Sequence, residues 1–180
     1  MATNNSHEQA VQTIPQRGFF GHPSGLGVLF FVEFWERFSY YGMRAMLIFY
    51  MYDQIKNGGL GIDQTTAMSI MSVYGALIYM SSIPGAWVAD RLFGTRGATL
   101  IGAVLIIIGH VCLSLPFAMF GLFASMFFII IGSGLMKPNI SNIVGRLYPE
   151  NDTRMDAGFV IFYMSVNLGA LISPIILQHF

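Results

Sequence analysis

Four ionisable side chains interrupt one long apolar stretch of this sequence, and their spacing puts them on one side of a helix. The stretch covers residues 30–52 and contains Glu33, Glu36, Arg37 and Arg44. At 100° per residue, these four and two neighbouring tyrosines fall within an arc of about 140°. Two carboxylates beside guanidinium groups can bind and release a proton, because burial favours the neutral carboxyl and a nearby cation favours the charged one.

A fifth ionisable residue, Lys137, interrupts another apolar stretch beside Pro138, which bends a helix. A charge near the centre of a bilayer costs ~3 kcal/mol or more, so such residues face a polar cavity and pair with one another. We expect Lys137 to exchange partners with Glu33 or Glu36 as these gain and lose a proton. The alternatives are a static cluster of buried salt bridges and, for Lys137, a fixed counter-ion.

The composition is that of an integral membrane protein. Of 180 residues, 54% are hydrophobic and only 10% are charged, whereas soluble domains average about 25% charged residues. The zero net charge excludes an electrostatic binder of nucleic acid. A single cysteine, Cys112, excludes a disulfide framework, and the four histidines lack the spacing of metal ligands.

Five apolar segments have the roughly 20 residues that a spanning helix needs, and all must be helical because lipid offers the backbone no hydrogen bonds. They cover about residues 25–52, 65–90, 97–116, 120–145 and 157–178. Residues 1–20 are polar and predict a cytoplasmic tail, whereas residues 21–180 predict a partial transmembrane bundle. Because transporters are often built from three-helix units, five helices indicate a fragment; a complete five-helix protein is the alternative.

The loop cations set the expected orientation. With a cytoplasmic N-terminus, the positive-inside rule is satisfied by five arginines in inner loops against Lys56 outside. The five are Arg17, Arg91, Arg96, Arg146 and Arg154.

The loop of residues 85–97, GAWVADRLFGTRG, resembles the cytoplasmic loop signature of major facilitator transporters. Asp90, Arg91 and Arg96 are the charged residues of this loop. We expect them to latch one conformation through charge contacts; a solvated, positively charged turn is the alternative.

Three further motifs point to one family. VEFWERFSYYGMRA, residues 32–45, resembles the first-helix signature of the proton-dependent oligopeptide transporter family, and LMKPN and FYMSVNLGA follow in that family's order and spacing. The resemblance implies an N-terminal major-facilitator bundle that lacks its sixth helix, within a transporter of 12–14 helices. It implies alternating access and proton-driven import of di- and tripeptides across the cell membrane, with no cofactor beyond the proton gradient.

The resemblance also assigns residues. Glu33, Glu36 and Arg37 look like the proton-coupling residues, with Lys137 as their partner. The residues that look like peptide contacts are Tyr40, Tyr41, Arg44, Tyr79, Lys137 and Asn167. The acidic residue that holds the peptide amino group would lie in a C-terminal bundle outside this chain.

Two other functions remain open on the residues. One is proton-coupled symport of another small anion such as nitrate, although the intact Glu-x-x-Glu-Arg run favours peptides. The other is a membrane-embedded enzyme that uses Glu33 and Glu36 as acid and base. No nucleophile pattern or metal site in the sequence supports the enzyme.

Overall fold

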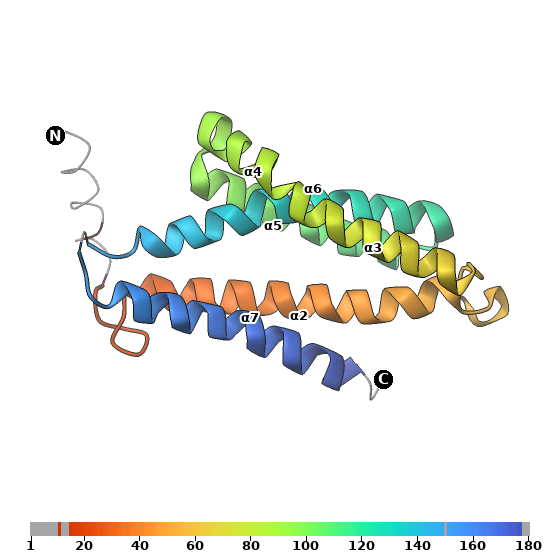
Figure 1. Ribbon diagram of the computed structural model, residues 1–180, viewed down its shortest axis with the longest axis horizontal. Helices are drawn as coiled ribbons and strands as arrows, with labels where there is room; N and C mark the ends of the chain where they lie inside the picture. Colours follow the sequence, from red (N-terminus) through yellow and green to blue (C-terminus); the bar gives the residue numbers. More distant parts are fainter. Residues whose placement is uncertain (1–10, 12–14, 150, 178–180) are drawn as a thin grey trace. The chain divides into compact units, whose positions relative to one another are not determined.

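The computed structural model describes residues 11, 15–149 and 151–177, and their regular structure is helical apart from one isolated bridge between Phe19 and His22. Figure 1 shows the helices along the chain. They are α2 (Ser24–Tyr52), η1 (Ile55–Asn57), α3 (Gln64–Met80), α4 (Ser82–Val88), the π-helix η2 (Ala89–Phe93), α5 (Gly94–Ser114), α6 (Ala118–Gly145) and α7 (Met155–Leu177).

Three helical segments of the described chain are long and apolar enough to cross a membrane. They are Gln64–Ser114, Ala118–Gly145 and Met155–Leu177. The helix α2 also has the length to span a bilayer, with 29 residues, but it carries the four ionisable residues noted above. The expected all-helical architecture is therefore confirmed.

The expected count of five helices is wrong for the described chain, which has four continuous helical runs. The predicted loop between residues 90 and 97 is itself helical, so residues 64–114 form one run of 51 residues. The reason is that the π-helix η2 joins α4 to α5 in place of a polar turn. We predicted a loop here because the segment contains charged residues and glycines. Asp90 and Arg91 nevertheless lie within the π-helix, which ends at Phe93 and is capped by Gly94.

This long run nevertheless folds back on itself. Gly85 in α4 lies against the backbone of Gly134, and Gly102 in α5 lies against the backbone of Gly132. In a straight helix Gly85 and Gly102 would be about 25 Å apart, whereas their partners are only about 3 Å apart along α6. The reversal lies at Gly94, whose φ of +67° is a conformation that glycine adopts readily.

The chain divides into two compact units. Residues 1–46 and 142–180 make the first, which we call the α2–α7 unit; residues 47–141 make the second, the α3–α6 unit. In the α2–α7 unit, one face of α7 is buried, and its members recur every three or four residues, as the packed face of a helix requires. They are Gly158, Phe162, Ser165, Gly169 and Ser173.

The described part of the predicted tail is ordered. Phe20 and Gly21 have positive φ angles of 52° and 80°, and they form a tight turn before α2. Arg154 Nη1 donates to the carbonyl oxygens of Gln16 and Gly21, at 3.0 and 3.2 Å. Residues 15–22 are therefore fastened to the segment that precedes α7, and do not extend as a structureless tail.

Candidate functional site

Arg37 bridges two carboxylates within one turn of α2. Its Nε atom lies 2.8 Å from Glu33 Oε1 and 3.2 Å from Glu36 Oε2. The side chains of Glu33, Glu36 and Arg37 are only 2%, 6% and 16% exposed. Both acids contact the same guanidinium, so a change in the protonation of either one would alter its contact with Arg37.

Glu33 has one carboxylate oxygen that the bridge does not use. Its Oε2 atom is buried and accepts no hydrogen bond from any residue that the structure describes. Oε2 of Glu36, the atom that faces Arg37, is likewise buried. Both acids of the cluster are therefore largely shielded from solvent.

The other candidate residues of α2 continue along the helix. Tyr40 is buried, and its ring centroid lies 5.2 Å from that of Tyr41 in an edge-to-face arrangement. Arg44 is exposed and forms no ion pair with the described residues. The structure therefore brings Arg37 to the carboxylates but leaves Arg44 outside the ion-pair cluster.

In α7, the side chain of Asn167 is exposed, and its amide nitrogen donates to the carbonyl oxygen of Tyr163 at 3.1 Å. Gly169, two residues on, belongs to the buried face that packs on α2. Asn167 consequently lies on a different side of α7 from the α2 contact.

Two further candidates meet in the α3–α6 unit. The ammonium nitrogen of Lys137, in α6, lies 5.6 Å from the ring centroid of Tyr79, in α3. Lys137 is half-buried, whereas Tyr79 is 68% exposed. A cation over an aromatic face at this distance is attracted to the ring, so Tyr79 helps to orient Lys137.

The three residues assigned to the conformational latch are all exposed, in η2 and the start of α5. The Arg91 guanidinium lies 5.9 Å from the ring centroid of Trp87. Among the described residues, Asp90, Arg91 and Arg96 form no ion pairs. The latch therefore stays a prediction.

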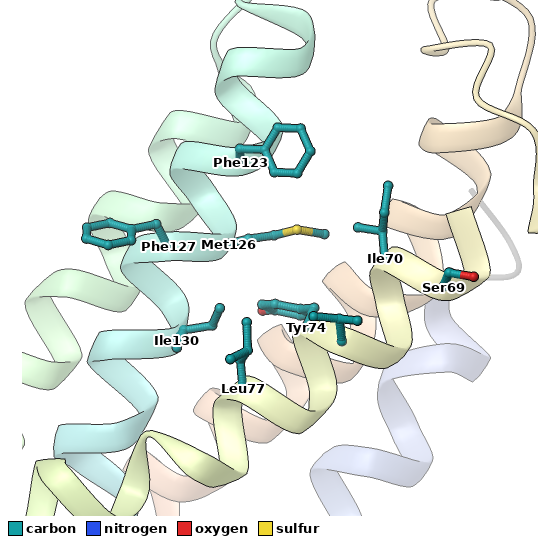
Figure 2. Close-up of a pocket in the computed structure, with 9 residues that line it drawn as sticks. Ser69, Ile70, Tyr74, Leu77, Phe123, Met126, Phe127 and Ile130 are labelled. Carbon is teal, nitrogen blue, oxygen red and sulfur yellow. The ribbon is translucent and has the colours of Figure 1, made fainter. Parts of the chain in front are cut away.

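A cavity between α3 and α6 was not expected from the sequence (Figure 2). It encloses about 410 Å³, within the size range of ligand sites, but it has few polar groups to orient a ligand. Its aliphatic and aromatic lining looks like ordinary membrane-helix packing in sequence, so no signal could have singled it out. The lining residues are Ser69, Ile70, Val73, Tyr74, Leu77, Phe123, Met126, Phe127 and Ile130.

Metal chemistry finds no support in the described part of the chain, where no group of three His, Cys, Asp or Glu side chains is placed to hold an ion. Sequence reasoning also missed the pairing of Asp152 with Arg154, whose Oδ2 and Nη2 atoms lie 2.7 Å apart. Arg154 had been counted only among the loop cations.

Comparisons with known proteins agree on one family. The profile described as POT family matches residues 97–180. The chain is 54% identical over 170 residues to the uncharacterized transporter YclF of Bacillus subtilis, covering 94% of this chain and 35% of that protein. It is 53% identical over 163 residues to a di-/tripeptide transporter of Lactococcus lactis subsp. cremoris, covering 89% of this chain and 33% of the other.

Solved structures agree as well. A POT family transporter in complex with 5-aminolevulinic acid is 89% identical, with a TM-score of 0.92 over 94% of this chain and 35% of that one. The peptide transporter POT in complex with sulfate is 57% identical, with a TM-score of 0.91 over 94% of this chain and 34% of the other. The chain thus spans about a third of the length of the proteins that it matches.

Proposed function

The chain belongs to the POT family, and on this premise we propose that it is part of a proton-coupled symporter of di- and tripeptides that works by alternating access. It is an integral membrane protein, in keeping with its apolar helices and its transporter relatives. The names of these relatives support peptides as substrates and do not favour nitrate. They are transporters, which also argues against the membrane-embedded enzyme.

The observation that carries the proposal is the bridge from Arg37 to Glu33 and Glu36. With both acids charged, the Arg37 guanidinium contacts two carboxylates in a poorly hydrated place. Binding of a proton at either acid weakens its attraction to Arg37 and lets the guanidinium turn toward the other acid. A change in protonation can thereby be converted into a change in side-chain contacts, which proton-driven transport requires.

For the substrate, we propose that Lys137 and Arg44 hold the peptide carboxylate. Lys137 already lies over the ring of Tyr79, and Arg44 is exposed and not engaged in an ion pair with a described residue. Both carry a positive charge that attracts the negative carboxylate of a peptide. Tyr40, Tyr41, Tyr79 and Asn167 would supply aromatic and amide contacts to the peptide.

The topology is part of the proposal. Because the run of residues 64–114 reverses at Gly94, we propose that it crosses the membrane twice, which makes five crossings in all. The N-terminus would be cytoplasmic in the cell membrane, and Asp90, Arg91 and Arg96 would lie at the cytoplasmic reversal, where they could latch one conformation. The rest of the transporter would supply the C-terminal bundle and the other half of the peptide site.

The test uses a full-length transporter that carries this sequence, reconstituted in liposomes. Glu33→Gln and Glu36→Gln keep the side-chain shape but remove the ionisable group. We expect each to abolish accumulation of di-alanine driven by a pH gradient, while exchange of labelled for unlabelled di-alanine at equal pH continues. Asp156→Asn, an exposed acid in the first turn of α7, is the control and should accumulate substrate normally.

Two outcomes would count against the proposal. If both Gln variants accumulated di-alanine as well as the wild type does under a pH gradient, Glu33 and Glu36 would not be the proton-coupling residues. Uptake of labelled substrate by the wild type that unlabelled di-alanine cannot compete with would remove peptides as the substrate class.

A further inference from the structure

At Gly169 the backbone of α7 lies directly against α2, next to Arg37. A Cβ atom added to Gly169 would fall 2.7 Å from the carbonyl oxygen of Phe34, 2.9 Å from Cβ of Arg37 and 3.1 Å from the amide nitrogen of Phe38. These neighbours are backbone atoms or an atom attached directly to the backbone, so they cannot rotate away. Any side chain at position 169 must push the two helices apart.

The same contact repeats one turn further along both helices. The Ser173 hydroxyl donates to the carbonyl oxygen of Phe38 at 2.6 Å. A Cβ atom added to Gly42 would fall 2.6 Å from that hydroxyl oxygen. Positions 169 and 173 therefore pack on successive turns of α2, and the helices run side by side in the same direction (Figure 1). The hydrogen bond and the two glycines together define the register and the rotation of α2 against α7.

This contact bears on one functional side chain in particular. Cβ of Arg37 touches the Gly169 position, while the other end of the same side chain bridges Glu33 and Glu36. An arginine side chain has several rotatable bonds, and fixing them in one conformation costs conformational entropy. Neighbouring atoms that already limit the side chain reduce the further entropy that is lost when the bridge forms. The flat surface at Gly169 restricts the stem of Arg37 and the backbone that carries it.

We propose that Gly169 is a positioning residue for the Arg37 bridge: by carrying no side chain, it lets α7 seat directly on α2 and holds Arg37 between the two carboxylates. Ser173 supports the same seat through its hydrogen bond to Phe38. The role of this bridge in proton coupling rests on the function proposed above. The packing of α7 on α2 at Gly169 and Ser173 does not depend on that function.

The first experiment measures thermal stability and needs no transport. Gly169→Ala, Glu33→Gln and the double variant are compared in the full-length protein. If Gly169 acts through the bridge, the drop in melting temperature caused by Gly169→Ala becomes smaller once Glu33→Gln has weakened that bridge, since residues that share an interaction are not additive. Additive shifts in melting temperature would overturn the proposal, because they would mean that Gly169 only allows the two helices to pack and does not act through the bridge.

The second experiment measures coupling. We expect Gly169→Ala to reduce gradient-driven accumulation of di-alanine about tenfold or more relative to exchange at equal pH, since a misplacement of about 1 Å can be that damaging. Gly158→Ala is the matched control. It adds the same methyl group to the same helix face, but against Tyr148, away from the charged run. It should lower stability while leaving the ratio of accumulation to exchange unchanged.

Ser173→Ala keeps the test decisive if Gly169→Ala does not fold. It removes the hydrogen bond to Phe38 without adding volume, and we expect a shift of the accumulation-to-exchange ratio in the same direction, about two- to fivefold. An unchanged ratio in every folded variant, alongside loss of accumulation in Glu33→Gln, would overturn the positioning role but leave the proposed function standing. An unchanged ratio together with normal accumulation in Glu33→Gln would instead contradict the proposed function.

Discussion

The carbonyl oxygen of Gly134 lies directly against Gly85, so α4 and α6 cross with no side chain between their backbones. Lipid supplies little hydrophobic force to press two helices together, and close contact between backbones supplies packing energy in its place. The crossing helps to hold the folded-back run of residues 64–114 against α6.

Gly85→Ala should therefore destabilise the protein. The added methyl group would collide with the backbone of Gly134, and we expect a loss of about 1–3 kcal/mol, as for other overpacked sites. Gly75→Ala is the control, because its methyl group would meet no atom within 4 Å and alanine favours a helix over glycine by about 1 kcal/mol. Thermal unfolding of the two variants in one detergent should move in opposite directions.

Arg37→Ala should be far more damaging to folding than Arg44→Ala. Removal of Arg37 takes an ion-pair partner from two buried carboxylates, and breaking a buried pair typically lowers the free energy of unfolding by about 3–5 kcal/mol. Arg44 is exposed on the same helix, and its removal should change that energy by less than about 0.5 kcal/mol. Equal melting temperatures for the two variants would show that the bridge does not stabilise α2.

The ring of Tyr79 should matter more than its hydroxyl group. Tyr79→Leu removes the aromatic face under Lys137, and a contact of this kind at an exposed site contributes about 0.5–1 kcal/mol. We expect di-alanine to bind about two- to fivefold more weakly. Tyr79→Phe keeps the face and should bind nearly as the wild type does; the half-saturating concentration in uptake assays distinguishes the two.

The pairing of Asp152 with Arg154 should make the order of residues 15–22 dependent on pH. Hydrogen bonds from Arg154 lower the pKa of Asp152 below its usual 3.8. A depressed pKa means that the stabilisation is present above pH 3.8 and is lost as the pH falls through the lower, folded value.

Asp152→Asn should consequently speed hydrogen exchange at pH 7 of the amides of Gly18 and His22, which are bonded within the turn that Arg154 holds. Asp156→Asn serves as the control, since Asp156 is exposed in the first turn of α7. The melting temperatures of wild type and Asp152→Asn should differ at pH 5 and above, and should converge below the folded pKa of Asp152. A difference that persists at still lower pH would contradict the assignment.

The sequence by itself determined the class of protein and the identity of its most unusual helix. Long apolar stretches predicted membrane helices, and the four-residue spacing of Glu33 and Arg37 already placed them one turn apart, where the structure pairs them. Both results depend on composition and on the helical repeat, which act locally along the chain.

The tertiary structure alone decided which backbones approach one another. The packing of both arms of the run 64–114 on α6 and the seat of α2 on Gly169 and Ser173 depend on contacts between residues far apart in sequence. The meeting of Lys137 with Tyr79 does so as well. From the sequence alone, a glycine or serine in an apolar helix looks the same whether its side of the helix faces lipid or the backbone of another helix. Only packing, which is set by the shape of both surfaces at once, distinguishes the two.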